Sequence, residues 1–331
     1  MHIAKSKINK ILVISLSNIG DVVLTFPVID ILHQDFPKAQ LSVVVGPKVE
    51  ALFKGNPYIH QVLLYHKKQS FLQMIAWLAQ LRKNNYDFVV DLRNTVIPFL
   101  VSTHYVTPPS LKRNAREHMR QQHLRRLRAI YMYEEKPRER CALYVPPQER
   151  LSATNMICNE IGDRKPYVVI APGAADSSKR WPEEKFGCLA DGLIKRFAVQ
   201  VVFIGDKNDR ALADAICQRM EQRAVNFCGR ISLIHCAVVL EKSCAALVND
   251  SAPMHLASYL DVPTVALFGP TDPRLYGPWS RSFCVVERKS LCPVCQNPRR
   301  QGTHCCMDAI SVEDVLNAFE ITSSRDVILK N

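Results

Sequence analysis

No stretch of this 331-residue sequence approaches the roughly 18 consecutive apolar residues that a membrane-spanning helix requires. The apolar stretch near the N-terminus is interrupted at Gly20 and Asp21, and no small-residue cleavage motif follows it. Low-complexity tracts and short-period repeats are also missing. We therefore expect a cytoplasmic protein without a signal peptide.

The G-x-G-x-x-G fingerprint of dinucleotide-binding proteins is missing after the first apolar run, which disfavours an NAD-type dehydrogenase. The run is followed instead by "SLSNIGD" (15–21), a loop with one glycine and one carboxylate. Asp21 could cap the following helix by accepting backbone N–H bonds. It could also act as a base at the end of a buried strand. The loop alone leaves both roles open.

Acidic residues are scarce beside basic ones, 31 against 43, and the net charge of +12 indicates an anionic partner. The segment 112–128 holds seven Lys or Arg residues and one Glu. It could be a solvated face, but its charge density favours contact with phosphates, carboxylates or acidic lipids. Few aromatic residues are interleaved, so we do not expect nucleic acid as the partner.

Twelve cysteines would suggest a disulfide scaffold in a short secreted chain, but this chain is long, so we expect reduced thiols. In "CPVCQNPRRQGTHCC" (292–306), Cys292 and Cys295 have the spacing of half a metal site. The adjacent Cys305 and Cys306 make a poor second half, since both cannot easily face one tetrahedral ion. A reduced loop without metal is the expectation.

Short Val/Ile/Leu runs alternate with helical patterns along both halves of the chain, which predicts parallel sheets covered on both faces. Strands are expected at 10–15, 40–46, 62–65, 87–92, 166–173, 199–205, 245–250 and 264–269, and helices at 22–36, 71–84, 182–197, 209–220 and 251–260. A polar, proline-containing segment, 134–150, indicates a connection between two domains. We predict two doubly wound α/β domains, 1–150 and 151–331, with ligands in the cleft at the carboxyl ends of the strands.

The second half carries candidate phosphate-binding groups. Asp250 and Ser251 precede a helix whose free N–H groups could hold a phosphate, although a merely well-capped helix would look the same. Lys179 and Arg180 stand before another helix and suit a diphosphate, but such a pair is also common on surfaces. The Gly/Pro loop 268–279 follows a strand at the same edge.

Five motifs, in order, resemble the lipopolysaccharide heptosyltransferases of glycosyltransferase family 9 over nearly the whole chain. They are "SNIGDVVLTFPVI", "DFVVDLR", "APGAADSSKRWPEEKF", "NDSAPMHLASYLDVPTVALFGPTDP" and the tail "LCPVCQNPRRQGTHCCMDAISVEDVL". The chain departs from the family where Ala252 and Pro253 follow Ser251, in place of the frequent Thr-Gly or Ser-Gly. It also lacks a further tail cysteine near Arg300.

The resemblance implies a GT-B fold of two Rossmann-like domains, with the acceptor on the first and the nucleotide sugar on the second. It implies inverting transfer of L-glycero-D-manno-heptose from ADP-heptose to the lipopolysaccharide inner core, without metal or other cofactor. Asp21 would be the general base and Lys179 a phosphate contact. The other implied donor-site residues are Arg180, Asp250, Ser251, Ala252, His255, Gly269 and Thr271. The candidate acceptor-site residues are Ser17, Asn18, Arg93, Lys112, Arg113, Arg116 and Arg120.

The expected partners are thus a nucleotide sugar, an anionic lipopolysaccharide core and, peripherally, the cytoplasmic face of the inner membrane. Two alternatives remain. The same fold could use another nucleotide sugar or a protein hydroxyl, or it could bind nucleotide sugars or polyanions without catalysis.

Overall fold

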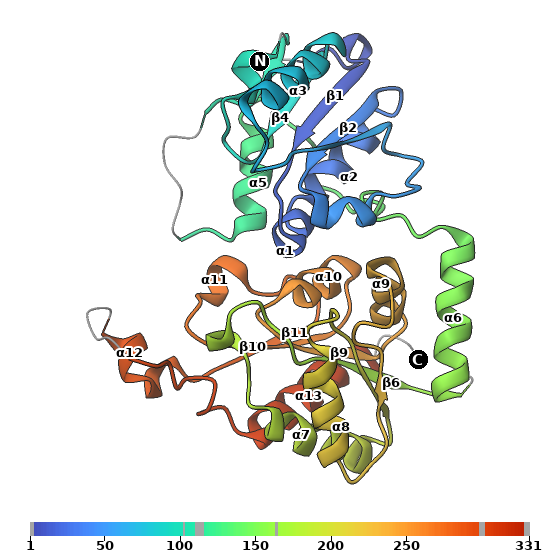
Figure 1. Ribbon diagram of the computed structural model, residues 1–331, viewed down its shortest axis with the longest axis vertical. Helices are drawn as coiled ribbons and strands as arrows, with labels where there is room; N and C mark the ends of the chain where they lie inside the picture. The colour runs from blue at the N-terminus through green and yellow to red at the C-terminus, as the bar shows by residue number, and fades with distance from the viewer. Residues whose placement is uncertain (1–2, 102, 110–115, 163–164, 298–301, 328–331) are drawn as a thin grey trace. The chain divides into compact units, whose positions relative to one another are not determined.

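The computed structural model describes the chain except residues 1–2, 102, 110–115, 163–164, 298–301 and 328–331 (Figure 1). The chain divides into two compact units, Met1–Pro146 and Pro147–Asn331. The division falls a few residues before the predicted boundary after residue 150. Each unit has its own parallel sheet, so the predicted doubly wound α/β class is what the structure shows.

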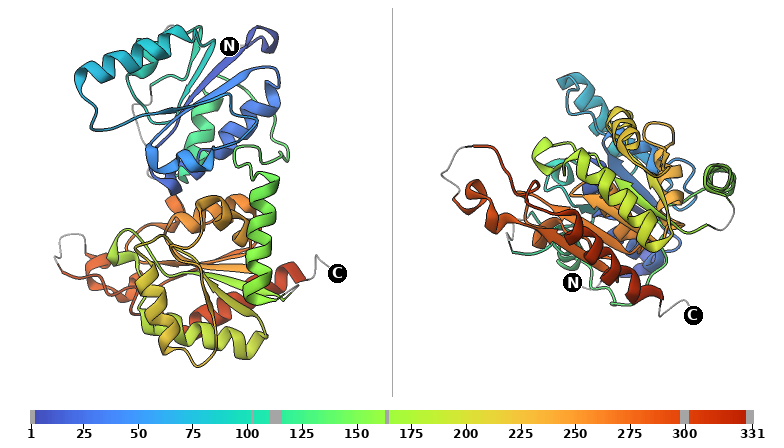
Figure 2. Two further views of the ribbon diagram at one scale, coloured as in Figure 1. Left: turned by 45° about the vertical axis from the view of Figure 1, so that its right-hand side comes forward. Right: turned by 90° about the horizontal axis from the view of Figure 1, so that it is seen from below.

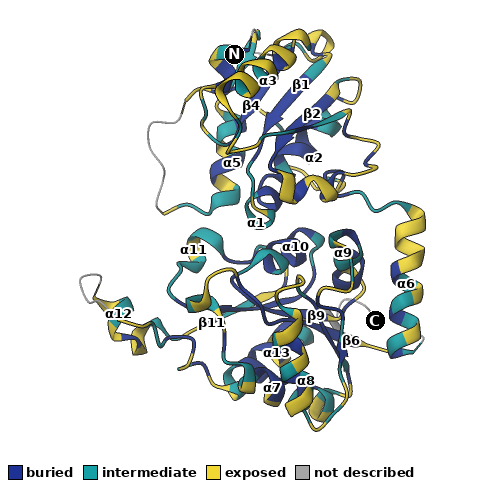
Figure 3. Cartoon of the chain, viewed as in Figure 1, coloured by how far each residue is buried: buried dark blue, intermediate teal, exposed yellow. Residues whose placement is uncertain are grey.

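The first unit is built on a parallel sheet with strand order β3-β2-β1-β4-β5. Its strands are β1 (Lys10–Ile14), β2 (Gln40–Val45), β3 (Gln61–Leu64), β4 (Phe88–Asp91) and β5 (Tyr105–Val106). β1 and β4, at the centre of the sheet, are buried almost throughout, as the dark blue colour in Figure 3 shows. Continuous apolar strands of this kind require cover on both faces.

The helices of this unit are α1 (Ile19–Val23), α2 (Phe26–Asp35), α3 (Phe71–Lys83), α4 (Ile97–Leu100) and α5 (Met119–Arg128), with short 3₁₀ turns η1 (Lys5–Lys7) and η2 (Pro47–Leu52). The single helix expected at 22–36 is wrong. The chain breaks it at Thr25, whose hydroxyl donates to the Val22 carbonyl at 2.7 Å. A new helix begins at the next residue, Phe26, with Pro27 in its first turn.

The segment 134–150 is not a free connection. The backbone N–H groups of Cys141 and Ala142 donate to the buried Asp30 carboxylate at 2.9 and 2.8 Å. The Asn56 amide donates to both of their carbonyls. Residue 147 already begins helix α6 (Pro147–Ile161). The predicted linker is therefore packed on the first unit at residues 141–143, whereas most of its other residues are exposed.

The second unit has a parallel sheet with strand order β11-β10-β9-β6-β7-β8. Its strands are β6 (Tyr167–Ala171), β7 (Gln200–Phe203), β8 (Val225–Asn226), β9 (Ala245–Asn249), β10 (Thr264–Phe268) and β11 (Phe283–Glu287). Numbered from β6, this is the 3-2-1-4-5-6 order of dinucleotide-binding folds. The order places a topological switch point between β6 and β9.

The helices of the second unit, besides α6, are α7 (Glu183–Phe197), α8 (Arg210–Arg219), α9 (Leu233–Glu241), α10 (Ala252–Leu260), α11 (Pro273–Tyr276), α12 (Pro293–Gln296) and α13 (Val312–Val327), with 3₁₀ turns η3 (Ser177–Lys179) and η4 (Lys289–Leu291). Helix α7 contacts both α8 and α13, and α9 contacts both α6 and α10. Figures 1 and 2 show the two groups on opposite faces of the sheet. The sheet is thus covered on both sides.

An apolar patch lies exposed on the first unit. Phe71 and Leu72 at the start of α3 are 79% and 77% exposed, and Val96 and Phe99 near α4 are 69% and 68% exposed. The start of α3 is correspondingly yellow in Figure 3. None of the helices in the described part of the chain has the length and apolar content to cross a membrane. We call Phe71, Leu72, Ile75, Val96 and Phe99 the α3–α4 patch.

Candidate active site

In each unit the candidate side chains follow the strands at the centre of the sheet. In the second unit they follow β6, β9 and β10, and in the first they follow β1 and β4. The pairs β6–β9 and β1–β4 are the points where the strand order changes direction. Loops at the carboxyl ends of such strands form the ligand sites of doubly wound folds.

Lys179, Asp250 and Thr271 form one polar cluster in the second unit. The Lys179 Nζ donates to Asp250 Oδ2 at 2.7 Å, and the Thr271 hydroxyl donates to the same oxygen at 2.6 Å. The Asp250 side chain is 5% exposed and the Lys179 side chain 26%. One carboxylate therefore fixes an ammonium group and a hydroxyl at the switch point, and the Lys179 side chain is partly open to solvent.

The start of α10 is open to an anion, and the alternative of a well-capped helix is not what the structure shows. Ser251 is the N-cap residue, but its side chain makes no capping hydrogen bond and turns back to the Asn249 carbonyl at 3.2 Å. First-turn N–H groups left uncapped, together with the helix dipole, attract a phosphate. Ala252 stands at the first helical position. His255, one turn on, is buried and stacks on Trp279 with ring centroids 5.7 Å apart.

Arg180 does not join the cluster. Its Nε donates to the Ala174 carbonyl within its own loop, at 2.8 Å, and the residue is exposed. The loop is fitted closely to its surroundings, since a Cβ at Gly173 would lie 2.1 Å from an Asp209 carboxylate oxygen. Burial raises the pKa of Asp209. Of the two cations expected beside α7, only Lys179 points to the donor-site candidates.

Gly269 allows three segments to pack together. A Cβ there would lie 2.8 Å from the Ser178 carbonyl oxygen and 3.1 Å from Met307 Cγ. Gly269 therefore has a packing function between the β6 loop, the β10 loop and the tail. Its neighbour Thr271 makes the polar contact.

Three further polar residues at this edge were missed by sequence reasoning. Asn249 is fully buried; its amide donates to the Pro172 carbonyl at 2.8 Å, and its Oδ1 accepts the Trp181 N–H. Asp209 lies against Gly173, and the Lys289 ammonium donates to the Thr271 carbonyl. Only Asn249 carried a sequence signal, a polar residue ending an apolar strand.

In the first unit, Asp21 lies in the first turn of α1 and does not cap it. Asn18 is the N-cap residue, and its side-chain amide donates to Asp21 Oδ2 at 3.0 Å. Asp21 itself is half-buried. The helix-cap alternative is therefore wrong, and the carboxylate is held beside Asn18 with its other oxygen uncommitted among the described contacts.

The other first-unit candidates flank this loop. The Ser17 hydroxyl is buried without a hydrogen-bond partner among the described residues. Ser17 packs closely on Gly46, since a Cβ added at Gly46 would lie only 2.7 Å from the Ser17 Cβ. Arg93 follows β4, and its guanidinium stacks over the Tyr65 ring at 5.0 Å. Because Ile14 of β1 pairs with Asp91 of β4, these residues share one sheet edge with Asp21.

The cations of the basic segment differ in exposure and in contacts. Lys112 and Arg113 lie outside the described residues, Arg116 is exposed, and Arg120 is half-buried. Burial lowers the pKa of Arg120 and of Arg126, whose Nε donates to the Asp91 carbonyl at 2.8 Å. Arg125 pairs with Glu117 at 3.1 Å. The segment is therefore not purely a solvated face, since Arg126 holds it to the end of β4.

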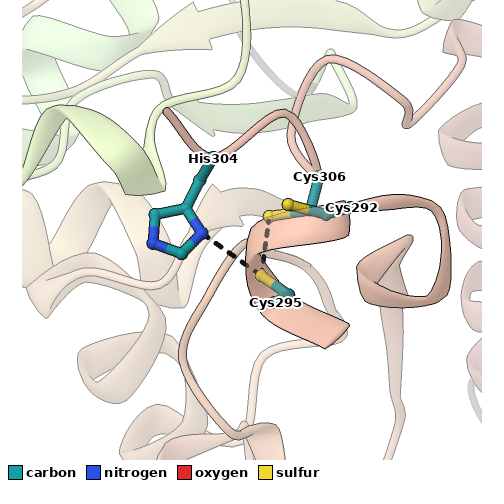
Figure 4. A group of neighbouring side chains, drawn as sticks. All are labelled: Cys292, Cys295, His304 and Cys306. Atoms are coloured by element: carbon teal, nitrogen blue, oxygen red, sulfur yellow. Dashed lines mark hydrogen bonds between the residues drawn. The ribbon is translucent and has the colours of Figure 1, made fainter. Parts of the chain in front are cut away.

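Near the C-terminus, Cys292, Cys295, His304 and Cys306 converge (Figure 4). Their ligand atoms all lie within 4.8 Å of one another. The sequence offered Cys292, Cys295, Cys305 and Cys306 only as a disfavoured metal site, and the structure groups His304 with three of them in place of Cys305. Hydrogen bonds from the backbone N–H groups of Cys295 and Cys305 outweigh burial and lower the pKa of Cys292 to about 5.

Comparison with known proteins identifies the family of the chain. The sequence pattern of glycosyltransferase family 9 (heptosyltransferase) matches residues 111–301, more than half of the chain. Lipopolysaccharide heptosyltransferase 3 of Escherichia coli is 25% identical, over 91% of this chain and 95% of its own.

Two solved structures share the fold. The family 9 glycosyl transferase of Veillonella parvula DSM 2008 superposes with a TM-score of 0.79 at 23% identity, covering 96% of this chain and 97% of that one. E. coli heptosyltransferase WaaC, solved with ADP, gives a TM-score of 0.69 at 18% identity, covering 94% and 99%. The expected GT-B heptosyltransferase fold is thereby confirmed. The chain belongs to glycosyltransferase family 9, the heptosyltransferases.

Proposed function

We propose that this heptosyltransferase moves L-glycero-D-manno-heptose from ADP-heptose to the inner core of lipopolysaccharide, with inversion and without a metal in the chemical step. The observation that carries the proposal is the Lys179–Asp250–Thr271 cluster beside the uncapped start of α10. The relatives support the substrates: one is named for lipopolysaccharide, and WaaC was solved with ADP.

The second unit would stabilise the leaving group. In the transfer, the bond between the anomeric carbon and the diphosphate oxygen breaks, and its electron pair leaves with ADP. A cation and helix N–H groups aimed at that diphosphate lower the barrier where negative charge develops. Asp250 is itself an anion, so its proposed role is to orient Lys179 and Thr271 rather than to contact phosphate.

The first unit would supply the base. The acceptor hydroxyl oxygen forms the new bond to the anomeric carbon, and its proton goes to the Asp21 carboxylate. Asn18 donates to one Asp21 oxygen at 3.0 Å and so orients the other. Ser17, Asn18, Arg93 and Arg116 are the described candidates for holding the acceptor.

Asp21→Asn tests this mechanism. The amide keeps the shape of the side chain but cannot take a proton, so turnover should fall by about 100- to 10,000-fold. ADP release from ADP-heptose, in the presence of core acceptor, measures turnover, and calorimetry of ADP binding should give the wild-type affinity. Glu50→Gln, an exposed carboxylate of the same unit, serves as the control. Unchanged turnover in Asp21→Asn would remove Asp21 as the base.

The donor and acceptor assignments need their own test. ADP-, GDP- and UDP-sugars compared by thermal shift distinguish the proposed donor from another nucleotide sugar, because a ligand that binds the native state raises its melting temperature. A shift with GDP- or UDP-sugars alone would overturn the donor assignment. A shift without turnover on any acceptor would favour the non-catalytic alternative.

The α3–α4 patch gives the proposed peripheral contact with a membrane a physical basis. Exposed Phe71 and Leu72 adjoin the exposed Lys67 and Lys68. Apolar side chains next to cations suit the boundary between anionic headgroups and acyl chains. The acceptor would be reached at such a surface, on the cytoplasmic face of the inner membrane.

A further inference from the structure

The four side chains of the tail cluster have ligand atoms within 4.8 Å of one another, and two of the separations are close to those of a metal-binding tetrahedron. Cys295 Sγ lies 3.7 Å from Cys306 Sγ and 3.3 Å from His304 Nδ1. With metal–sulfur and metal–nitrogen bonds of about 2.3 and 2.0 Å, neighbouring ligand atoms of a tetrahedron lie about 3.5–3.8 Å apart. These two separations differ from the edges of the tetrahedron by a few tenths of an ångström at most. The widest separation in the group, within 4.8 Å, would have to shorten by up to about 1 Å on binding an ion.

The spacing of the four residues along the chain accounts for this arrangement. Cys292 and Cys295 stand one turn apart around the short helix α12, in a C-x-x-C spacing. His304 and Cys306 lie two residues apart in the segment that precedes α13, and both belong to the group while Cys305 between them does not. Cys292 and Cys306 are fully buried, and Cys295 and His304 are half-buried. Figure 4 shows the three sulfurs and the imidazole nitrogen directed at a common space.

A disulfide explains this grouping less well than a metal does. A disulfide joins two sulfurs and leaves the third thiol and the imidazole without a reason to converge. Three thiolates and one imidazole are, by contrast, a complete ligand set for a tetrahedral ion. Soft sulfur ligands select Zn²⁺ or Fe²⁺ over Mg²⁺ or Ca²⁺.

We propose that Cys292, Cys295, His304 and Cys306 bind one divalent ion, Zn²⁺ or Fe²⁺, as a structural site. All four positions of the tetrahedron are filled by protein, which leaves none for substrate or water and distinguishes the site from a catalytic one. The proposal does not depend on the heptosyl transfer proposed above.

The position of the site indicates what the ion stabilises. Just before the cluster, the Lys289 ammonium donates to the Thr271 carbonyl. Just after it, the Met307 side chain packs against Gly269, which has no side chain to obstruct it. The ion would close the 292–306 loop between these two contacts. It would thereby hold the 269–271 segment, whose Thr271 hydroxyl contacts Asp250.

The test is the metal content of the full chain, purified without a polyhistidine tag and after dialysis. Elemental analysis should find about one zinc or iron per chain, and the element found identifies the ion. Cys306→Ser and His304→Ala should each lose most of it. Cys305→Ser is the matched control and should keep it. Circular dichroism establishes that the variants are folded, and Cys295→Ser replaces Cys306→Ser if the buried change prevents folding.

A second readout does not involve activity. Replacing the ion with Co²⁺ should give a thiolate-to-cobalt charge-transfer band and the intense visible bands of tetrahedral cobalt, absent in Cys306→Ser. A chelator should lower the melting temperature of the wild type and leave that of Cys306→Ser unchanged. Metal-free wild type that takes up no ion on reconstitution would overturn the proposal. Equal metal loss in Cys305→Ser, or a disulfide among the four residues in the native protein, would do the same.

Discussion

The Lys179 ammonium group lies 2.7 Å from the Asp250 carboxylate, although 71 residues separate them in the sequence. Their loops follow β6 and β9, which are neighbours in the second sheet. The pair is mostly withdrawn from water, with 26% and 5% of the side chains exposed. It is therefore screened less by salt than the exposed ion pairs of the surface.

Replacing Lys179 by Met should weaken donor binding. Charge-assisted hydrogen bonds contribute about 1.5–3 kcal/mol, so the Kd for ADP should rise by about 10- to 100-fold. Calorimetric titration with ADP measures this. Lys195→Met is a suitable control, because Lys195 pairs with Glu221 at the exposed surface of α7. Equal affinities in the two variants would show that Lys179 does not face the diphosphate.

Of two arginines in the basic segment, we expect Arg126 to contribute to stability and Arg116 to acceptor binding. Arg126→Met removes the hydrogen bond to the Asp91 carbonyl and should lower the free energy of unfolding by about 1–2 kcal/mol. Arg116→Glu changes an exposed side chain and should spare stability while reducing the use of an anionic acceptor. Urea unfolding and acceptor KM separate the two effects. A stable Arg126→Met protein would contradict the structural assignment.

Stability at acid pH should depend on Asp35. Burial alone would raise its pKa, but hydrogen bonds from Arg138, at 2.9 and 3.2 Å, and from Tyr131, at 2.9 Å, hold the pKa below its usual value. A depressed carboxyl pKa stabilises the fold above the unfolded pKa of about 3.9, and this contribution is lost as pH falls through the lower folded pKa.

Asp35→Asn should therefore be less stable than the wild type near neutral pH, and the difference should shrink as the pH is lowered below about 4. Urea unfolding over a pH series provides the measurement, with the exposed Glu134→Gln as control. A difference that stays constant over the whole series would mean that the charge of Asp35 is not what stabilises this edge.

The α3–α4 patch should mediate lipid binding. The double variant Phe71→Ser, Leu72→Ser removes its two most exposed apolar side chains and should reduce binding to vesicles containing anionic phospholipid by about tenfold or more. Co-sedimentation measures the bound fraction. Leu151→Ser, at an exposed apolar position on α6, should bind as the wild type does. Unchanged sedimentation of the double variant would exclude the patch as the contact.

The sequence predicted the central strands because their residues are apolar without interruption, and only parallel sheets covered on both faces bury such runs. It missed α5 for the opposite reason. The buried residues of α5 include Gln122 and His123 beside Leu127, so its hidden face has no hydrophobic period to detect.

Within the site, the sequence named residues but could not give their partners. The motifs pointed to Lys179, Asp250 and Thr271, yet their shared oxygen follows from strand order, which no local pattern contains. In the tail, the sequence did not distinguish Cys305 from Cys306 as a neighbour of Cys292 and Cys295. The structure brings Cys306 and His304 to them, and Cys305 is not in the group. For Asp21, only the capping role was decided by the structure, in which Asn18 is the N-cap residue.

The hydrogen bonds from Cys141 and Ala142 to Asp30 also bear on how the protein is made. A nascent chain leaves the ribosome at about 5–20 residues per second, so Asp30 emerges several seconds before these partners. Until then, the edge of the first unit that they cover stays open to water. We therefore expect this unit to close only when its own last residues have been translated, which is also before most of the second unit exists.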